Sequence, residues 1–136
     1  MFDFEKLDVY SKMEGVTAEV LKKIFGDRSL DPFLKDQLKR AIVSVTLNLA
    51  EGSGRMSPAD KKHFYAMARS SLFESVALLR ILKSQQLLTD VQFDRWYQEM
   101  EAISKMILKL IQKTSSSLPS QTQTHTHTQT QTYPGD

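Results

Sequence analysis

Four long runs of apolar residues, recurring at steps of three and four positions, restrict the fold of this chain more than any other feature. That spacing places the apolar side chains on one face of an α-helix. The runs cover residues 8–25, 32–51, 58–82 and 89–114, and only short segments connect them. Long helices with short connections pack antiparallel to their neighbours, so the sequence predicts an all-α, antiparallel up-down-up-down four-helix bundle over residues 1–114.

The segments between these runs hold residues that are typical of helix ends. Asp31 and Ser57 each precede a proline, as expected of an N-cap followed by the first helical residue. Thr89 lies three residues before a glutamine, which resembles a capping box. Gly26 and the glycines of residues 52–54 predict helix C-termini. The helix boundaries are therefore predicted from local residues alone.

The residues needed for catalysis or metal binding are scarce. The chain has no cysteine, which excludes disulfides, thiol catalysis and cysteine-rich zinc sites. His63 stands on the polar side of the third predicted helix without the spacing of a ligand set. Residues 52–55 are glycine-rich, but they follow a helix and lack the lysine of a phosphate-binding loop. We therefore expect a protein that is not an enzyme and that needs no metal or cofactor.

No apolar run is long enough to cross a bilayer, and the N-terminus lacks the layout of a signal peptide, so the expected location is the cytoplasm, away from membranes. From residue 115 the composition changes to alternating glutamine, threonine and histidine. Such a segment buries too little apolar surface to offset the entropy lost on ordering, so residues 115–136 are predicted to form a disordered tail. His125 and His127 could chelate a metal weakly, but a solvated tail is favoured.

Positive charge is concentrated in the middle of the chain, where residues 35–83 hold nine Lys or Arg and four Asp or Glu. On a helical wheel, five of these cations share an arc of roughly 100° on the third predicted helix. We call them the cationic stripe: Lys61, Lys62, Arg69, Arg80 and Lys83.

Tyr65 falls within the arc of the cationic stripe, and Phe73 falls at its margin. Aromatic rings among cations suit an RNA strand, whose phosphates attract charge and whose unpaired bases stack on flat rings. Lys35, Lys39 and Arg55 are expected to support this binding. The alternative is a solvated face whose long cationic side chains extend over apolar surface.

The second predicted helix is apolar nearly all round between residues 41 and 50. Val43 and Leu47 point away from its main apolar face, so this helix needs two partners. One partner is its own bundle, and the other is either a neighbouring subunit or a second helix of the same chain.

Several segments resemble one known family. They are residues 4–10 (FEKLDVY), residues 36–44, residues 48–52 together with Arg55, and residues 64–74. In order and spacing they are similar to bacterial four-helix bundle proteins encoded in intervening sequences of 23S ribosomal RNA genes. The resemblance covers residues 2 to about 113. It departs from the family at Thr46 and Leu47, where an isoleucine-proline pair is usual, and in the Gln/Thr/His tail.

This resemblance implies assembly as a ring-shaped homopentamer. It also implies kinship with the accessory variability protein of diversity-generating retroelements, a basic pentamer that binds reverse transcriptase and nucleic acid. The family motif residues Asn48, Glu51 and Arg55 are expected to serve in helix-end hydrogen bonding and ion pairing. Arg40 and Glu74, opposite charges on adjacent helices, are expected to pair across the bundle.

Two hypotheses follow. The first is a noncatalytic, oligomeric RNA-binding protein or reverse-transcriptase accessory factor that binds through the cationic stripe. The second is a structural or protein-protein adaptor with no nucleic-acid role.

Overall fold

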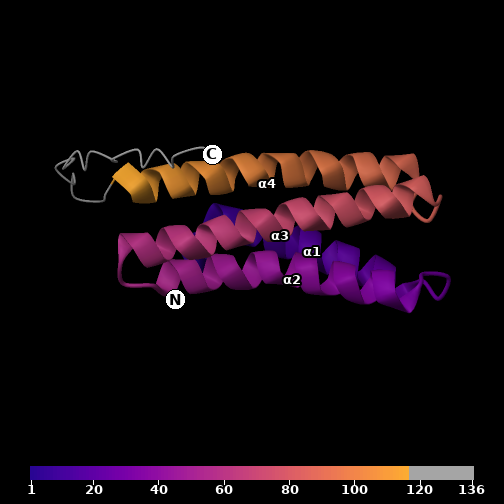
Figure 1. The fold of residues 1–136 in the computed structure, drawn as a ribbon, viewed down its shortest axis with the longest axis horizontal. Coiled ribbons are helices and arrows are strands. Elements are labelled where there is room, and N and C mark those ends of the chain that lie inside the picture. The colour runs from indigo at the N-terminus through magenta and orange to yellow at the C-terminus, as the bar shows by residue number, and fades with distance from the viewer. Residues whose placement is uncertain (117–136) are drawn as a thin grey trace, which may run out of the picture.

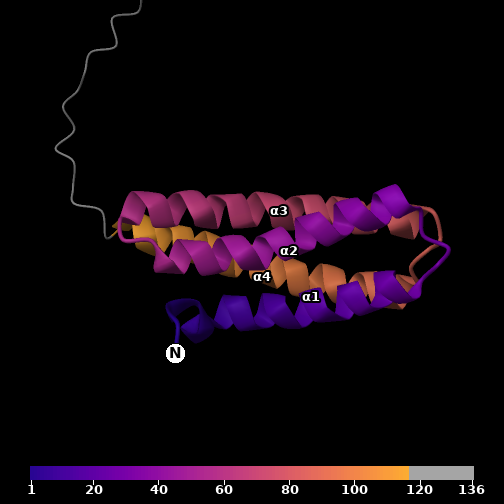
Figure 2. The ribbon, with the colours of Figure 1, turned by 90° about the horizontal axis from the view of Figure 1, so that it is seen from below.

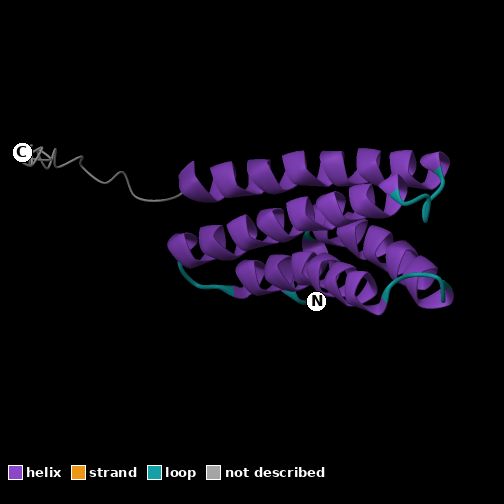
Figure 3. Ribbon diagram, turned by 45° about the vertical axis from the view of Figure 1, so that its right-hand side comes forward, coloured by secondary structure: helices purple, strands orange, loops and turns teal. Residues whose placement is uncertain are grey.

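The computed structural model describes residues 1–116, which form four long helices lying side by side (Figures 1 and 2). These residues include no strand, so the prediction of an all-α fold is confirmed (Figure 3). The elements in chain order are a 3-10 helix η1 (Asp3–Lys6), α1 (Asp8–Gly26), α2 (Pro32–Gly54), α3 (Pro58–Ser84) and α4 (Asp90–Ser116).

The ends of these helices follow the local signals in the sequence. The Asp31 carboxylate accepts hydrogen bonds from the backbone N–H groups of Phe33 and Leu34, at 2.8 and 3.3 Å. The Ser57 hydroxyl accepts one at 3.1 Å in the first turn of α3. The Thr89 hydroxyl accepts one at 3.1 Å in the first turn of α4. Each cap satisfies N–H groups that have no partner inside the helix.

Two predicted boundaries need adjustment. α2 continues to Gly54, so both Gly52 and Gly54 lie within the helix, and Arg55 is its C-cap. α4 continues to Ser116, two residues beyond the predicted end of the bundle. The predicted tail from residue 117 onward, including His125 and His127, lies outside the described residues.

One hydrophobic core joins all four helices. Its fully buried side chains include Met13 of α1, Ile42 of α2, Leu72 of α3 and both Met100 and Ile103 of α4. α2 contacts α1 and α3, and α4 contacts α3 and α1, whereas no Cα atom of α1 lies within 8 Å of one in α3. α1 and α3 therefore occupy diagonal positions in the bundle.

α2 and α3 pack closely because small residues line their interface. The Ser44 and Ser71 hydroxyls are hydrogen-bonded at 2.9 Å, and Ala68 and Ser75 are completely buried. Further along the interface, Gly52 lies against the ring of Tyr65. Residue numbers fall along α2 as they rise along α3, so these two helices are antiparallel.

Glu19 connects α1 to α4 through its carboxylate. The indole N–H of Trp96 donates a hydrogen bond to Glu19 Oε2 at 3.1 Å. Arg95 forms an ion pair with the other carboxylate oxygen. Trp96 is 5% exposed, so its hydrogen bond to Glu19 satisfies an N–H group that is largely removed from water.

Within residues 1–116, none of the helices combines the length and apolar character needed to span a membrane.

Candidate nucleic-acid interface

Lys62 and Arg80 are the two exposed members of the cationic stripe. Both lie on α3, and neither forms an ion pair or a side-chain hydrogen bond with another residue in the described part of the chain. Their positive charge is therefore available to an external anion.

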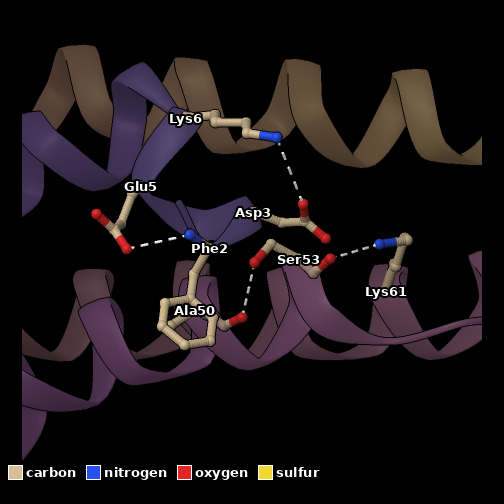
Figure 4. A network of polar contacts seen from close by, with 7 residues as sticks. All are labelled: Phe2, Asp3, Glu5, Lys6, Ala50, Ser53 and Lys61. Carbon is tan, nitrogen blue, oxygen red and sulfur yellow. Dashed lines mark hydrogen bonds and ion pairs between the residues drawn. The ribbon is translucent and has the colours of Figure 1, made fainter.

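Lys61 has a different role, because it caps the end of α2. Its ammonium group donates a hydrogen bond to the Ser53 carbonyl at 2.8 Å. Figure 4 shows this bond beside the N-terminal turn η1, together with the hydrogen bond from the Ser53 hydroxyl to the Ala50 carbonyl at 2.8 Å. A cation at a helix C-terminus stabilises unpaired carbonyls and the negative end of the helix dipole. Lys61 is half-buried there and contributes less charge to the surface.

The two remaining members of the cationic stripe lie over aromatic rings. The Arg69 guanidinium is 4.5 Å from the centre of the Phe73 ring. The Lys83 ammonium is 4.5 Å from the centre of the Phe93 ring. Both cations are half-buried, and Arg69 Nε is buried with no hydrogen-bond partner in the structure. These contacts orient the cations while leaving their charge intact.

Tyr65 does not lie on the surface, so the prediction that it stacks on a base is wrong. It is only 3% exposed and belongs to the hydrophobic core. Its ring fills the space beside Gly52, which has no side chain to occupy it. Burial, and to a smaller extent the charge of Asp3, raises the pKa of the Tyr65 phenol. Phe73, which is 52% exposed, is the aromatic ring that accompanies the cations on the surface.

The supporting cations lie on or next to α2 and are partly neutralised by acidic neighbours. Lys39 pairs with Asp36 at 3.9 Å, and Arg55 pairs with Glu51 at 3.9 Å. The Arg55 guanidinium also lies 4.3 Å from the centre of the Phe64 ring. Lys35 is half-buried. These residues are not part of the α3 surface that carries Lys62 and Arg80.

The expected structural roles are confirmed only in part. Glu51 and Arg55 do form an ion pair at the end of α2. Asn48 acts one turn earlier, because its amide donates to the Ser44 carbonyl at 2.9 Å and to the Ser44 hydroxyl at 3.0 Å. The predicted ion pair between Arg40 and Glu74 is wrong, since the structure has no contact within 4.0 Å between them. Both side chains are exposed, where pairing gains little over hydration.

The second apolar face of α2 is open to solvent at Leu47, which is 59% exposed. Val43 is half-buried and packs against the core. The two residues line a shallow hollow on α2, with Lys39 and Arg40 at one end and Glu51 at the other. No helix of the described chain covers Leu47, so the alternative in which both partners of α2 are intrachain helices does not hold at this residue.

Sequence reasoning missed a hollow of about 340 Å³ between α3 and α4. Its lining includes Leu72 and Met100, both fully buried, and the partly exposed rings of Phe73 and Tyr97. Arg80 lies at its edge. The position of Phe73 at the margin of the cationic stripe is the only signal that pointed to this region.

Residues 1–116 contain no group of three or more His, Cys, Asp or Glu side chains placed to hold a metal ion. The family described as 23S rRNA-intervening sequence protein matches residues 5–109. A comparison with curated proteins gave no match.

Proposed function

Because the chain belongs to the family of 23S rRNA-intervening sequence proteins, we propose that it is a noncatalytic RNA-binding protein that works as a homo-oligomer. The observation that carries this proposal is the pair of exposed cations Lys62 and Arg80 on α3, with Arg69 between them along the helix. None of the three is paired with a carboxylate of the described chain. A line of unneutralised cations supports binding to a phosphate backbone.

Salt dependence tests this proposal directly. Each phosphate neutralised by a protein cation releases bound counterion, so RNA affinity falls as salt rises. With three phosphates neutralised per subunit, the logarithm of the affinity for single-stranded RNA is expected to fall against the logarithm of salt with a slope of about −2 for each engaged subunit. Fluorescence anisotropy over a series of salt concentrations measures this slope. A flat salt dependence, or no binding at low salt, contradicts the proposal.

The proposed assembly is a pentameric ring of up-down-up-down bundles. Support comes from Leu47, a large apolar side chain that is 59% exposed on α2. A neighbouring subunit that covered Leu47 and Val43 would remove this apolar surface from water. By its resemblance to the retroelement accessory protein, the chain is also proposed to bind a reverse transcriptase in the cytoplasm.

Light scattering after gel filtration tests the assembly. We expect a particle of about five times the 15.6 kDa of the chain. Leu47→Glu should give smaller particles with unchanged helical circular dichroism, because a buried, unpaired carboxylate opposes association and Leu47 makes little contribution to the core of its own subunit. A monodisperse monomer of the unsubstituted protein contradicts the proposed ring.

One observation favours a second candidate, a protein-protein adaptor. Lys61, Arg69 and Lys83 contact a carbonyl or an aromatic ring of their own chain, as expected of cations that cover apolar surface. The two candidates differ in RNA binding. An adaptor would not bind RNA even at low salt, although it would still form the oligomer.

A further inference from the structure

The hollow between α3 and α4, which we call the slot, is lined by one partly exposed aromatic ring from each helix. Phe73 of α3 is 52% exposed and Tyr97 of α4 is 38% exposed. The buried, apolar side chains of Leu72 and Met100 also line it. A flat, partly apolar ligand fits such a slot better than an extended or fully charged one.

Neighbouring groups hold both rings in position. Phe73 lies under the Arg69 guanidinium at 4.5 Å. Tyr97 packs on Phe93 at a distance of 5.7 Å between ring centres, and Phe93 lies under Lys83 at 4.5 Å. One cation of the cationic stripe thus lies over Phe73, and another lies over the ring that packs on Tyr97. Aromatic rings beside cations are the arrangement that binds unpaired bases and their phosphates together.

The polar groups at the rim restrict which base is suitable. Arg80 is exposed and supplies only donors, which suits a phosphate. Glu101 lines the same hollow, and its carboxylate supplies only acceptors. The Lys105 ammonium donates to Glu101 Oε1 at 3.3 Å. A carboxylate favours a base that offers two adjacent N–H donors. Guanine offers them at N1 and N2, whereas uracil has a single N–H donor at N3.

From this geometry we propose that the slot binds one unpaired guanine base of an RNA strand. The base stacks against the exposed rings of Phe73 and Tyr97, its N1–H and N2–H groups donate to Glu101, and Arg80 binds the adjacent phosphate. The inference rests on the proposed RNA binding and adds to it the site and the identity of the base. Occupation by guanine also explains why Phe73 and Tyr97 are left partly exposed in the single subunit.

The test compares two fluorescent single-stranded RNAs, an oligouridine and the same strand with one central guanine. The unsubstituted protein is expected to bind the guanine-containing strand about tenfold more tightly, within the range by which a bidentate contact to a base edge discriminates against the wrong base. Glu101→Gln should remove this preference and leave oligouridine affinity nearly unchanged. Phe73→Ala should weaken the binding of both strands, because every base stacks on an aromatic ring. Phe33→Ala is the matched control, since Phe33 is 68% exposed on α2 and should alter neither affinity.

The outcomes separate this inference from the proposed function. Equal affinity for both strands, with steep salt dependence, overturns the guanine slot and leaves RNA binding standing. Absence of binding to either strand overturns both. If Phe73→Ala dissociates the oligomer in light scattering, a second copy of the chain fills the hollow, and the guanine slot is overturned.

Discussion

Replacing two exposed cations of α3 by glutamate, Lys62→Glu with Arg80→Glu, should lower RNA affinity at least about a hundredfold at moderate salt. The double substitution changes the formal net charge of the chain from +2 to −2 and places carboxylates where phosphates are expected to bind. Both side chains are exposed and unpaired, so the fold should tolerate the change. Arg69 is left in place because it packs over Phe73.

The control carries the same change of charge on the opposite side of the bundle. Lys12 and Lys22 are exposed on α1, which lies diagonally across the bundle from α3. Lys12→Glu with Lys22→Glu should therefore weaken RNA binding far less than the α3 pair does. Anisotropy titrations measure affinity, and circular dichroism with gel filtration confirms that both variants stay folded and assembled. Equal losses in the two variants would show that only total charge matters and that α3 is not the interface.

The largest effect on stability is expected from Gly52→Ala. A Cβ atom at this position would lie 2.6 Å from Tyr65 Cε1, 2.8 Å from Cδ1 and 3.1 Å from Phe64 Cβ. The Tyr65 ring is buried in the core and cannot move aside without disturbing its neighbours. We expect a loss of about 2–3 kcal/mol in the free energy of unfolding. The midpoint of thermal unfolding should fall by about 10–15 °C.

Gly15→Ala is the matched control for this substitution. Gly15 lies within α1, and a Cβ atom there would have no atom within 4 Å. Alanine favours the helix over glycine, so this variant should gain about 0.5–1 kcal/mol. Calorimetry of both variants compares the same chemical change in crowded and open surroundings. A stabilised Gly52→Ala protein would mean that Tyr65 is not held against α2.

The starts of α2, α3 and α4 could be predicted because their causes are local. An N-cap at Asp31 or Ser57 needs only its own side chain and the next few backbone N–H groups. The same locality explains the success of the ion pair between Glu51 and Arg55, which lie one helical turn apart. Each of these features depends on residues that are close in sequence.

The misplacement of Tyr65 shows what local reasoning omits. A helical wheel put its ring roughly 40° from Lys61, inside the cationic stripe. The buried side of α3 in fact includes Tyr65, Ala68 and Leu72, so it is turned toward the cations. The reason is in another helix, because Gly52 and the small residues of the interface let α3 approach α2 on this side. A wheel of one helix has no information about its neighbour.

The hollow between α3 and α4 was missed for the same reason. Phe73 and Tyr97 belong to different helices, and each appears in the sequence as one isolated aromatic residue. Their proximity depends on how far α3 and α4 are displaced along each other, which apolar spacing does not specify. The prediction that Arg40 pairs with Glu74 was wrong for the same reason, since two side chains on adjacent helices do not necessarily meet.

The bond between Trp96 and Glu19 also gives the protein an internal optical reporter. Trp96 is the chain's only tryptophan, and its shielded indole is hydrogen-bonded across the boundary between α1 and α4. Indole emission shifts to the red when the ring becomes hydrated, so the colour of the fluorescence reports whether α1 remains docked. Because α1 lies diagonally opposite α3, the release of α1 can be followed separately from binding at Lys62 and Arg80.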